Sequence, residues 1–126
     1  MNYLLDTHIL LWWRMDAPEL GSKVRRIIEK EPVWVSTAVV WEMLIKKGIG
    51  KLKIPGNVDQ QLKDEGFHIL DIKLDHVMAL EKLEHHHADP FDRIQIAQAK
   101  TERFTFITKD KAIQKYSGLD ILSSPG

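Results

Sequence analysis

The chain alternates short apolar runs with longer amphipathic stretches along most of its length. The short runs are rich in β-branched and aromatic residues, which is typical of buried strands, whereas the stretches between them carry apolar residues at helical spacing. The predicted strands are 3–6, 33–36, 67–70, 105–108 and 120–122. The predicted helices are 7–15, 22–30, 37–47, 57–65, 75–83 and 90–102, with one short helix after residue 110.

Polar residues, proline and glycine mark several of the predicted helix ends. Ser22 and Asp75 stand where N-caps are expected, and Asp89-Pro90 combines an N-cap with proline at the first helical position. Because strands alternate with helices, the connections should be crossovers and the sheet should be parallel, with helices on both faces. We therefore expect an α/β fold, a three-layer α/β/α sandwich with a parallel four- or five-stranded sheet.

Length and composition predict a single domain over 1–126. The chain has 126 residues, of which 44% are hydrophobic, and this suits one compact core. It contains no cysteine, which excludes thiol catalysis, zinc–thiolate sites and disulfide scaffolds. No apolar run approaches the roughly 18 residues of a membrane helix, and the N-terminus lacks the basic region of a signal peptide. We expect a soluble, cytoplasmic protein.

Charge gives a local rather than a global indication. Lys plus Arg and Asp plus Glu number 18 each, so the net charge is zero and no overall basic excess indicates nucleic-acid binding. Lys46, Lys47, Lys51 and Lys53 nevertheless lie close together with no acid among them. This stretch is either a solvated surface or a contact for an anionic partner.

Four acidic residues fall where a parallel sheet binds its ligands, beyond the carboxyl ends of the strands. Asp6 ends the first predicted strand and Asp110 follows the fourth. Asp92 stands in the first turn of the helix before the fourth strand, and Glu42 lies in the helix after the second. Each has an ordinary explanation alone, because an aspartate can cap a helix and Glu42 can be a surface residue. Their convergence on one edge favours a bound ligand.

Convergent carboxylates repel one another, so a site that keeps several of them ionised usually holds a cation. All-oxygen ligation suits Mg²⁺ or Mn²⁺ rather than zinc. Such an ion polarises a phosphoryl oxygen and activates water, which is the chemistry of phosphodiester hydrolysis without a serine, cysteine or lysine nucleophile. The run His85-His86-His87 does not predict a zinc site, because three consecutive residues in regular structure cannot all point at one ion.

The same acids lie in segments that resemble the PIN-domain ribonucleases. The segments are 4–8 (Leu-Leu-Asp-Thr-His), 36–42 (Ser-Thr-Ala-Val-Val-Trp-Glu), 89–99 (Asp-Pro-Phe-Asp-Arg-Ile-Gln-Ile-Ala-Gln-Ala) and 108–110 (Thr-Lys-Asp). The resemblance is closest to the VapC toxins of bacterial toxin–antitoxin pairs. In those proteins a Gly-Lys-Leu turn, here Gly50-Lys51-Leu52, follows the glutamate helix, and a histidine, here His87, precedes the third segment.

The resemblance implies roles for individual residues. Metal binding would fall to Asp6, Glu42, Asp92 and Asp110. Glu42 would hold the ion or act as the base that orients the attacking water. Support for these ligands would come from Thr7, Asp89 and Arg93. Arg93 would pair with one of the acids or bind the scissile phosphate. Contacts to RNA would come from Lys46, Lys51 and His87. His87 has two alternatives, because it would otherwise help to position Asp89 or be an ordinary loop residue.

The resemblance also implies the strand order 3-2-1-4-5 and a metal-dependent endoribonuclease that leaves a 5′-phosphate and a 3′-hydroxyl. Its partners would be RNA, a second copy of the chain that packs on Trp12 or Trp13, and an antitoxin whose basic residue enters the acidic pocket. The alternatives are an inactive PIN-like binding module and a metal-dependent phosphatase. The phosphatase would need an acid or a small residue two positions after a nucleophilic aspartate, and Asp6 is followed there by His8.

Overall fold

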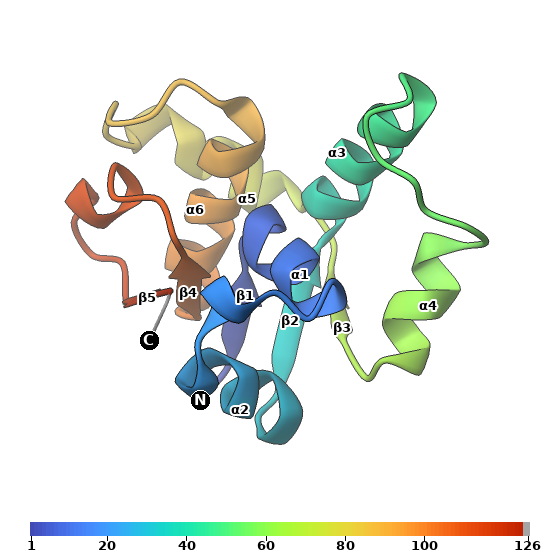
Figure 1. The fold of residues 1–126 in the computed structure, drawn as a ribbon. Helices are drawn as coiled ribbons and strands as arrows, with labels where there is room; N and C mark the ends of the chain where they lie inside the picture. The colour runs from blue at the N-terminus through green and yellow to red at the C-terminus, as the bar shows by residue number, and fades with distance from the viewer. Residues whose placement is uncertain (125–126) are drawn as a thin grey trace.

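The computed structural model, which describes residues 1–124, is built on a five-stranded parallel sheet (Figure 1). Its strands are β1 (Tyr3–Leu5), β2 (Val33–Ser36), β3 (His68–Leu70), β4 (Thr105–Thr108) and β5 (Ile121–Ser123). All four neighbouring pairs are parallel, and the order is β3-β2-β1-β4-β5. The predicted fold class and strand order are therefore confirmed. The order reverses between β1 and β4, which makes the carboxyl ends of these two strands the switch point of the sheet.

Alternation along the strands creates two hydrophobic cores, one on each face of the sheet. In β1, Leu4 belongs to one core and Leu5 to the other, and Phe106 and Ile107 divide in the same way in β4. Successive side chains of a strand point to opposite faces, so two adjacent apolar residues serve two layers. Both members of each pair are fully buried, as the near-continuous apolar strands predicted.

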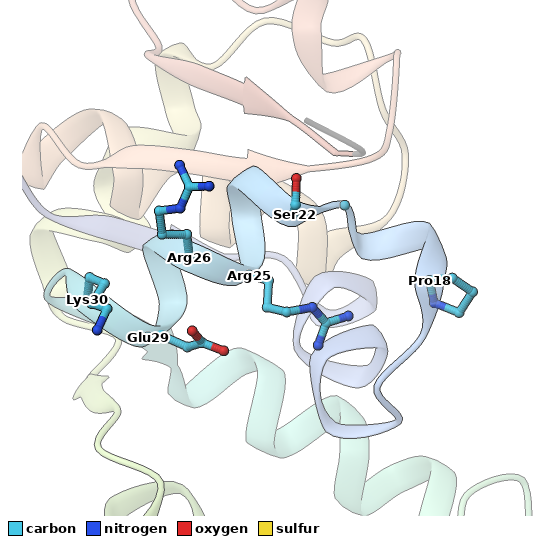
Figure 2. Close-up of a pocket in the computed structure, with 7 residues that line it drawn as sticks. Pro18, Ser22, Arg25, Arg26, Glu29 and Lys30 are labelled. Carbon is cyan, nitrogen blue, oxygen red and sulfur yellow. The ribbon is translucent and has the colours of Figure 1, made fainter.

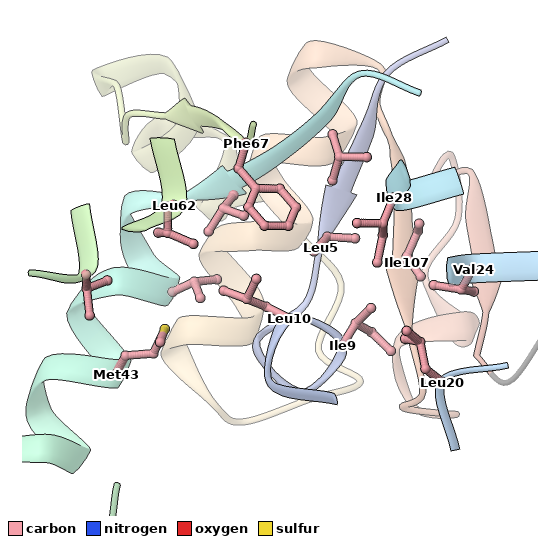
Figure 3. Packing of buried hydrophobic residues seen from close by; sticks show 14 of the residues in the cluster. Leu5, Ile9, Leu10, Leu20, Val24, Ile28, Met43, Leu62, Phe67 and Ile107 are labelled. Carbon is pink, nitrogen blue, oxygen red and sulfur yellow. The ribbon is translucent and has the colours of Figure 1, made fainter. Parts of the chain in front are cut away.

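Helices cover both faces and complete the three layers (Figure 1). The helices whose buried residues join the core of Leu5 are α1 (Thr7–Arg14), α2 (Ser22–Lys30), α3 (Thr37–Gly48) and α4 (Val58–Asp64). Figure 3 shows this core, in which Met43 and Leu62 approach Leu10 from one side and Leu20 and Val24 approach Ile9 from the other. The opposite face carries α5 (Leu74–Ala79) and α6 (Pro90–Glu102). Among residues 1–124, no helix combines the length and apolar character needed to cross a membrane.

The helices differ from the prediction at several places. Ser22 is the first residue of α2 and not its N-cap, which is Gly21. Asp75 is not an N-cap, because α5 begins at Leu74 after Lys73, whose N–H donates to His76 Nδ1 over 3.0 Å. This helix also ends at Ala79, and the 3₁₀ turn η2 (Leu80–Lys82) follows it. The short helix after residue 110 is likewise a 3₁₀ turn, η3 (Ile113–Lys115). A further 3₁₀ turn, η1 (Pro18–Leu20), was not predicted.

The exposed apolar surface lies on other helices than predicted. Trp12 and Trp13 are half-buried against the core, and the ring of Trp13 meets Phe67 edge-on with 5.2 Å between the centroids. These tryptophans therefore do not form the predicted exposed surface on α1. Six of the large exposed apolar side chains instead form i, i+3, i+4 triplets on two helices, Trp41, Leu44 and Ile45 on α3 and Leu74, Val77 and Met78 on α5, whereas Met1, Met15 and Ile49 are exposed elsewhere. We call these six residues the α3/α5 apolar face.

Candidate metal centre

Asp6 lies at the junction of β1 and α1 and is 3% exposed. It caps α1, because its Oδ1 accepts the N–H of Thr7 over 2.7 Å. Its Oδ2 accepts the hydroxyl of Thr108, also over 2.7 Å, from the end of the adjacent strand β4. Thr108 was not predicted as a site residue. Its place at the carboxyl end of the strand beside β1 is the signal that would have identified it.

Glu42 approaches the same edge from the second turn of α3. The hydroxyl of Thr7 donates to Glu42 Oε1 over 2.8 Å, so one threonine connects the Asp6 turn with α3. The other carboxylate oxygen, Oε2, lies 3.4 Å from Lys46 Nζ, one helical turn further along. Lys46 therefore neutralises a predicted metal ligand in this structure, whereas Lys51 lies exposed in the turn after α3.

The N-terminal turn of α6 brings Asp89 and Asp92 to the site. Asp89 is the N-cap, and its Oδ1 accepts the N–H of Phe91 over 2.8 Å and that of Asp92 over 3.2 Å. Two turns further along, Gln98 Oε1 accepts the hydroxyl of Ser36 at the end of β2 over 2.6 Å. This buried contact holds the helix against the sheet and so positions Asp92 at its carboxyl edge.

His87 joins the last two acids. Its Nε2 lies 2.7 Å from Asp110 Oδ2 and 3.2 Å from Asp92 Oδ2, while its Nδ1 accepts the N–H of Asp89 over 3.0 Å. Asp110 is itself held by the turn after β4, where its N–H donates to Thr108 Oγ1 over 3.0 Å. The three side chains form a group in which a carboxylate oxygen or a ring nitrogen from each lies within 4.8 Å of the others.

Burial and mutual repulsion disfavour ionisation of two of these carboxyl groups. The pKa of Asp92 is raised from 3.8 to about 7, first by desolvation and then by the charges of Asp6 and Asp89, with a smaller contribution from Glu42. Burial also raises the pKa of Asp6, against the hydrogen bonds from Thr108 and Thr7. Because the charges of Asp6 and Glu42 act on Asp92, the carboxylates of β1, α3 and α6 share one electrostatic site.

Arg93 does not pair with an acid as predicted. Its Nη1 donates to the backbone carbonyl of Glu84 over 2.8 Å, to that of His87 over 3.4 Å and to the hydroxyl of Tyr116 over 3.2 Å. The guanidinium therefore supports the loop that carries His87 and forms no ion pair with the four acids. The sequence offered no signal for this role, because the acceptors are two main-chain carbonyls and a distant tyrosine.

The donor set fits a hard divalent cation. Asp6, Glu42, Asp92 and Asp110 carry carboxylate oxygens on four different segments, and oxygen is the type of ligand that Mg²⁺ and Mn²⁺ prefer. Burial raises the pKa values of Asp6 and Asp92, so the surrounding side chains do not fully compensate the ionised form of either acid. A cation would supply that compensation.

A hollow in the surface lies apart from these acids, along the outer side of α2. It measures about 430 Å³ and is lined by Pro18, Gly21, Ser22, Arg25, Arg26, Glu29 and Lys30 (Figure 2). Arg25 is already engaged there, because its Nη1 lies 2.6 Å from Asp16 Oδ1 and its Nη2 donates to the carbonyl of Ala17. None of the predicted site residues lines this hollow.

Fold and site together define a class of protein: a parallel α/β sandwich whose carboxylates gather where the strand order reverses. The family model described as PIN domain matches residues 3–119. The chain therefore belongs to the PIN-domain family. No protein in a curated collection of sequences matches it.

Solved structures of toxin–antitoxin complexes share the fold. The chain is similar to VapBC2 from Rickettsia felis bound to a promoter DNA fragment, with a TM-score of 0.72, 15% identity and coverage of 98% of this chain and 99% of that one. It is also similar to DNA-bound VapBC from Salmonella typhimurium, with a TM-score of 0.71, 12% identity and 98% coverage of both chains. A toxin–antitoxin complex from Klebsiella pneumoniae gives a TM-score of 0.65 at 20% identity and 96% coverage of both.

Proposed function

We propose that the protein is a metal-dependent endoribonuclease and the toxin component of a VapBC-type toxin–antitoxin pair. The observation that carries the proposal is the gathering of Asp6, Glu42, Asp92 and Asp110 at the switch point of the sheet, where burial and repulsion raise the pKa of Asp92 to about 7. Membership of the PIN-domain family and the fold shared with toxin–antitoxin complexes support the same function.

The residues of the site divide the work of phosphodiester hydrolysis. Asp6, Asp92 and Asp110 would hold Mg²⁺ or Mn²⁺ from β1, α6 and the turn after β4. A divalent ion bound there supplies Lewis-acid stabilisation of the charge that develops on the phosphoryl group. Glu42, oriented by the Thr7 hydroxyl on its Oε1, accepts the proton of the attacking water at Oε2. Lys46 contacts Glu42 Oε2 in this structure. When RNA binds, Lys46 and Lys51 would instead contact its phosphate groups.

Two protein partners follow from this function. A ribonuclease must be held inactive in its own cytoplasm, and an antitoxin arginine or lysine that enters the acidic pocket would do so by pairing with the carboxylates. Lys46 already forms an ion pair with Glu42, so a basic side chain can neutralise one of these acids. The second partner is another copy of the chain, which would bury the α3/α5 apolar face.

Cleavage assays with purified protein test the activity directly. With Mg²⁺ or Mn²⁺ we expect cleavage of 5′-labelled RNA into products with 3′-hydroxyl ends, and EDTA should abolish it. Asp6→Asn and Asp92→Asn should each reduce the rate at least about 100-fold, because each removes a charge that neutralises the ion. Asp71→Asn is the control, since this exposed aspartate lies outside the site and should leave the rate unchanged.

The same assay separates the alternatives. Hydrolysis of p-nitrophenyl phosphate without cleavage of RNA would identify a phosphatase. Failure to cleave or hydrolyse either substrate under any metal condition, in a folded protein that still binds RNA, would identify an inactive binding module. Full activity in the Asp92→Asn variant would remove this residue from the mechanism.

A further inference from the structure

His87 occupies the position between two of the acids that are proposed to bind the cation. We propose that its Nε2–H group is an internal substitute for the metal: it holds Asp92 and Asp110 in the metal-free protein, is displaced from them when the cation binds, and thereby sets the metal affinity without being a ligand. The proposal rests on the metal site proposed above. Its observations are the two contacts of Nε2, at 2.7 Å from Asp110 Oδ2 and 3.2 Å from Asp92 Oδ2.

The tautomer of His87 follows from its other nitrogen. Nδ1 accepts the N–H of Asp89 over 3.0 Å, so it presents a lone pair there and carries no proton. The proton of the neutral ring must then sit on Nε2, where it is donated to Asp110 with Asp92 3.2 Å away. To ligate a metal through Nε2, the ring would have to move its proton to Nδ1, opposite the N–H of Asp89. The Nδ1–H group and the N–H of Asp89 would then be two donors facing each other. The hydrogen bond from Asp89 therefore favours the tautomer whose Nε2–H faces the carboxylates.

Arg93 keeps the backbone of His87 in this place. Its Nη1 donates to the carbonyl of Glu84 over 2.8 Å and to the carbonyl of His87 itself over 3.4 Å. One side chain on α6 therefore binds both ends of the segment 84–87. Because Asp92 precedes Arg93 on the same helix, one turn of α6 carries both the acid and the side chain that supports His87.

The other side of this segment is attached to the turn that follows η3. The hydroxyl of Tyr116, a residue that is 4% exposed, accepts the N–H of His86 over 3.2 Å and also accepts from Arg93. The carboxylate of Glu84 accepts the N–H and the hydroxyl of Ser117 over 2.8 and 2.7 Å. With both sides attached, the position of His87 is preorganised before any metal arrives.

The direction of the effect follows from this geometry. The hydrogen bond from His87 Nε2 to Asp110 and its 3.2 Å contact with Asp92 stabilise the two carboxylates when no metal is bound, and the cation must replace them. Without the imidazole the two carboxylates are less stabilised when no metal is bound. The free energy gained when the cation binds is therefore larger. A single hydrogen bond to a charged group corresponds to roughly a tenfold change in affinity. We therefore expect His87→Ala to bind Mn²⁺ about tenfold more tightly than the wild type. A histidine ligand would give the opposite result, weaker binding.

Calorimetric titration of the metal-free protein with Mn²⁺ alone at pH 8 measures this difference. The control is His85→Ala, which removes an exposed histidine of the same loop that makes none of these contacts and should leave the affinity unchanged. Tyr116→Phe removes only the hydroxyl shared by Arg93 and His86, and it should tighten binding less than His87→Ala does. Thermal denaturation in EDTA verifies that each variant is folded.

Electron spin-echo spectroscopy of bound Mn²⁺ distinguishes the two roles independently of affinity. If His87 donates only to the carboxylates, the wild type shows no directly coordinated nitrogen, and His87→Ala has the same spectrum. A nitrogen coupling that disappears in His87→Ala would overturn the proposal, as would Mn²⁺ affinity that is unchanged or weaker in this variant. In both cases the wild type still binds Mn²⁺, so the proposed function stands. If the wild type binds no Mn²⁺ and cleaves no RNA, the proposed function itself fails.

Discussion

At the scale of single residues, hydroxyl groups organise the acidic site. The Thr7 side chain donates to Glu42, and that of Thr108 donates to Asp6 while it accepts the N–H of Asp110. Each threonine therefore relates the positions of two acids that come from different elements. Such buried hydrogen bonds to carboxylates are worth more than neutral ones, because the acceptor is charged and largely removed from water.

Substitution of Thr108 tests this organisation. Thr108→Val keeps the shape of the side chain but removes the donor to Asp6 Oδ2, which leaves a buried carboxylate with less compensation. We expect a loss of about 1.5–3 kcal/mol in the free energy of unfolding, measured in urea, and slower RNA cleavage. Thr108→Ser retains the hydroxyl and should retain most of both properties. Equal losses in the two variants would assign the effect to packing of the methyl group instead.

The raised pKa of Asp92 makes the stability of the metal-free protein depend on pH. The folded state binds the proton up to about pH 7, whereas the unfolded chain releases it near 3.8. The folded state therefore holds more protons between these values, and stability is lost as the pH rises from about 4 to about 7. Asp92→Asn has no charge to bury, so in EDTA at pH 8 it should melt on the order of 5 °C above the wild type.

Thermal scans of both proteins from pH 4.5 to 8 measure the difference, which should grow with pH and then level off above about 7. Asp71→Asn, on an exposed aspartate, should show no such trend. A difference that does not change with pH would contradict the raised pKa of Asp92.

At the scale of elements, the N-terminus of α6 both caps the helix and presents Asp92 to the acidic site. Asp89 caps the helix and Pro90 fills its first position, and the same turn presents Asp92 to the site. The cap also brings a second negative charge close to Asp92, which contributes to its raised pKa. The helix start is thus stabilised by the group that makes the neighbouring carboxylate harder to ionise.

Two substitutions of Asp89 separate these effects. Asp89→Ala removes the acceptor for the N–H groups of Phe91 and Asp92 and should cost about 1 kcal/mol in the free energy of unfolding. Asp89→Asn keeps an acceptor oxygen but removes the charge, so it should remain close to the wild type in stability. Urea denaturation in EDTA compares the two. A loss as large in Asp89→Asn as in Asp89→Ala would show that the charge of the cap, and not its acceptor oxygen, stabilises the helix.

At the scale of the whole molecule, the α3/α5 apolar face gathers six of the large exposed apolar side chains among residues 1–124. Trp41 and Val77 also line a groove of about 240 Å³ between the two helices, with Ile72, Leu80, Pro90, Phe91 and Ile94 as its other walls. The ring of Trp41 meets Phe91 edge-on at 5.0 Å between centroids, close to the start of α6. A partner seated on this face would therefore lie beside the acidic site.

We expect the face to form a homodimer, detected by light scattering at micromolar concentration. Leu44→Lys combined with Val77→Lys should convert the dimer to a monomer, because two charges would have to be buried at the interface. Met15→Lys is the matched control, since Met15 is 71% exposed and lies at the end of α1, outside the face. A monomeric wild type, or a dimer that both sets of substitutions leave intact, would contradict this assignment.

The sequence by itself determined the layers, the parallel sheet and the acids at its edge. Strands such as β1 and β4 carry adjacent apolar residues, and this pattern requires a covered sheet on both faces. The Asp-Pro step before α6 gave the start of that helix, because capping and proline geometry are local properties. The family resemblance added the strand order, which then brought Asp6 and Asp110 to the same switch point.

Only the tertiary structure decided how these acids are neutralised and which surface stays exposed. The donors to the acids come from far along the chain, as with Thr108 and Asp6, 102 residues apart, so no local pattern reveals them. Arg93 donates to backbone carbonyls, which have no signature in the sequence. His87, and not Arg93, contacts Asp92 and Asp110. Trp12 and Trp13 are half-buried because they pack against the core below α1, whereas α3 and α5 each present one apolar face that no other described element covers. Burial and pairing depend on what packs nearby, and that is a property of the folded chain rather than of any one segment.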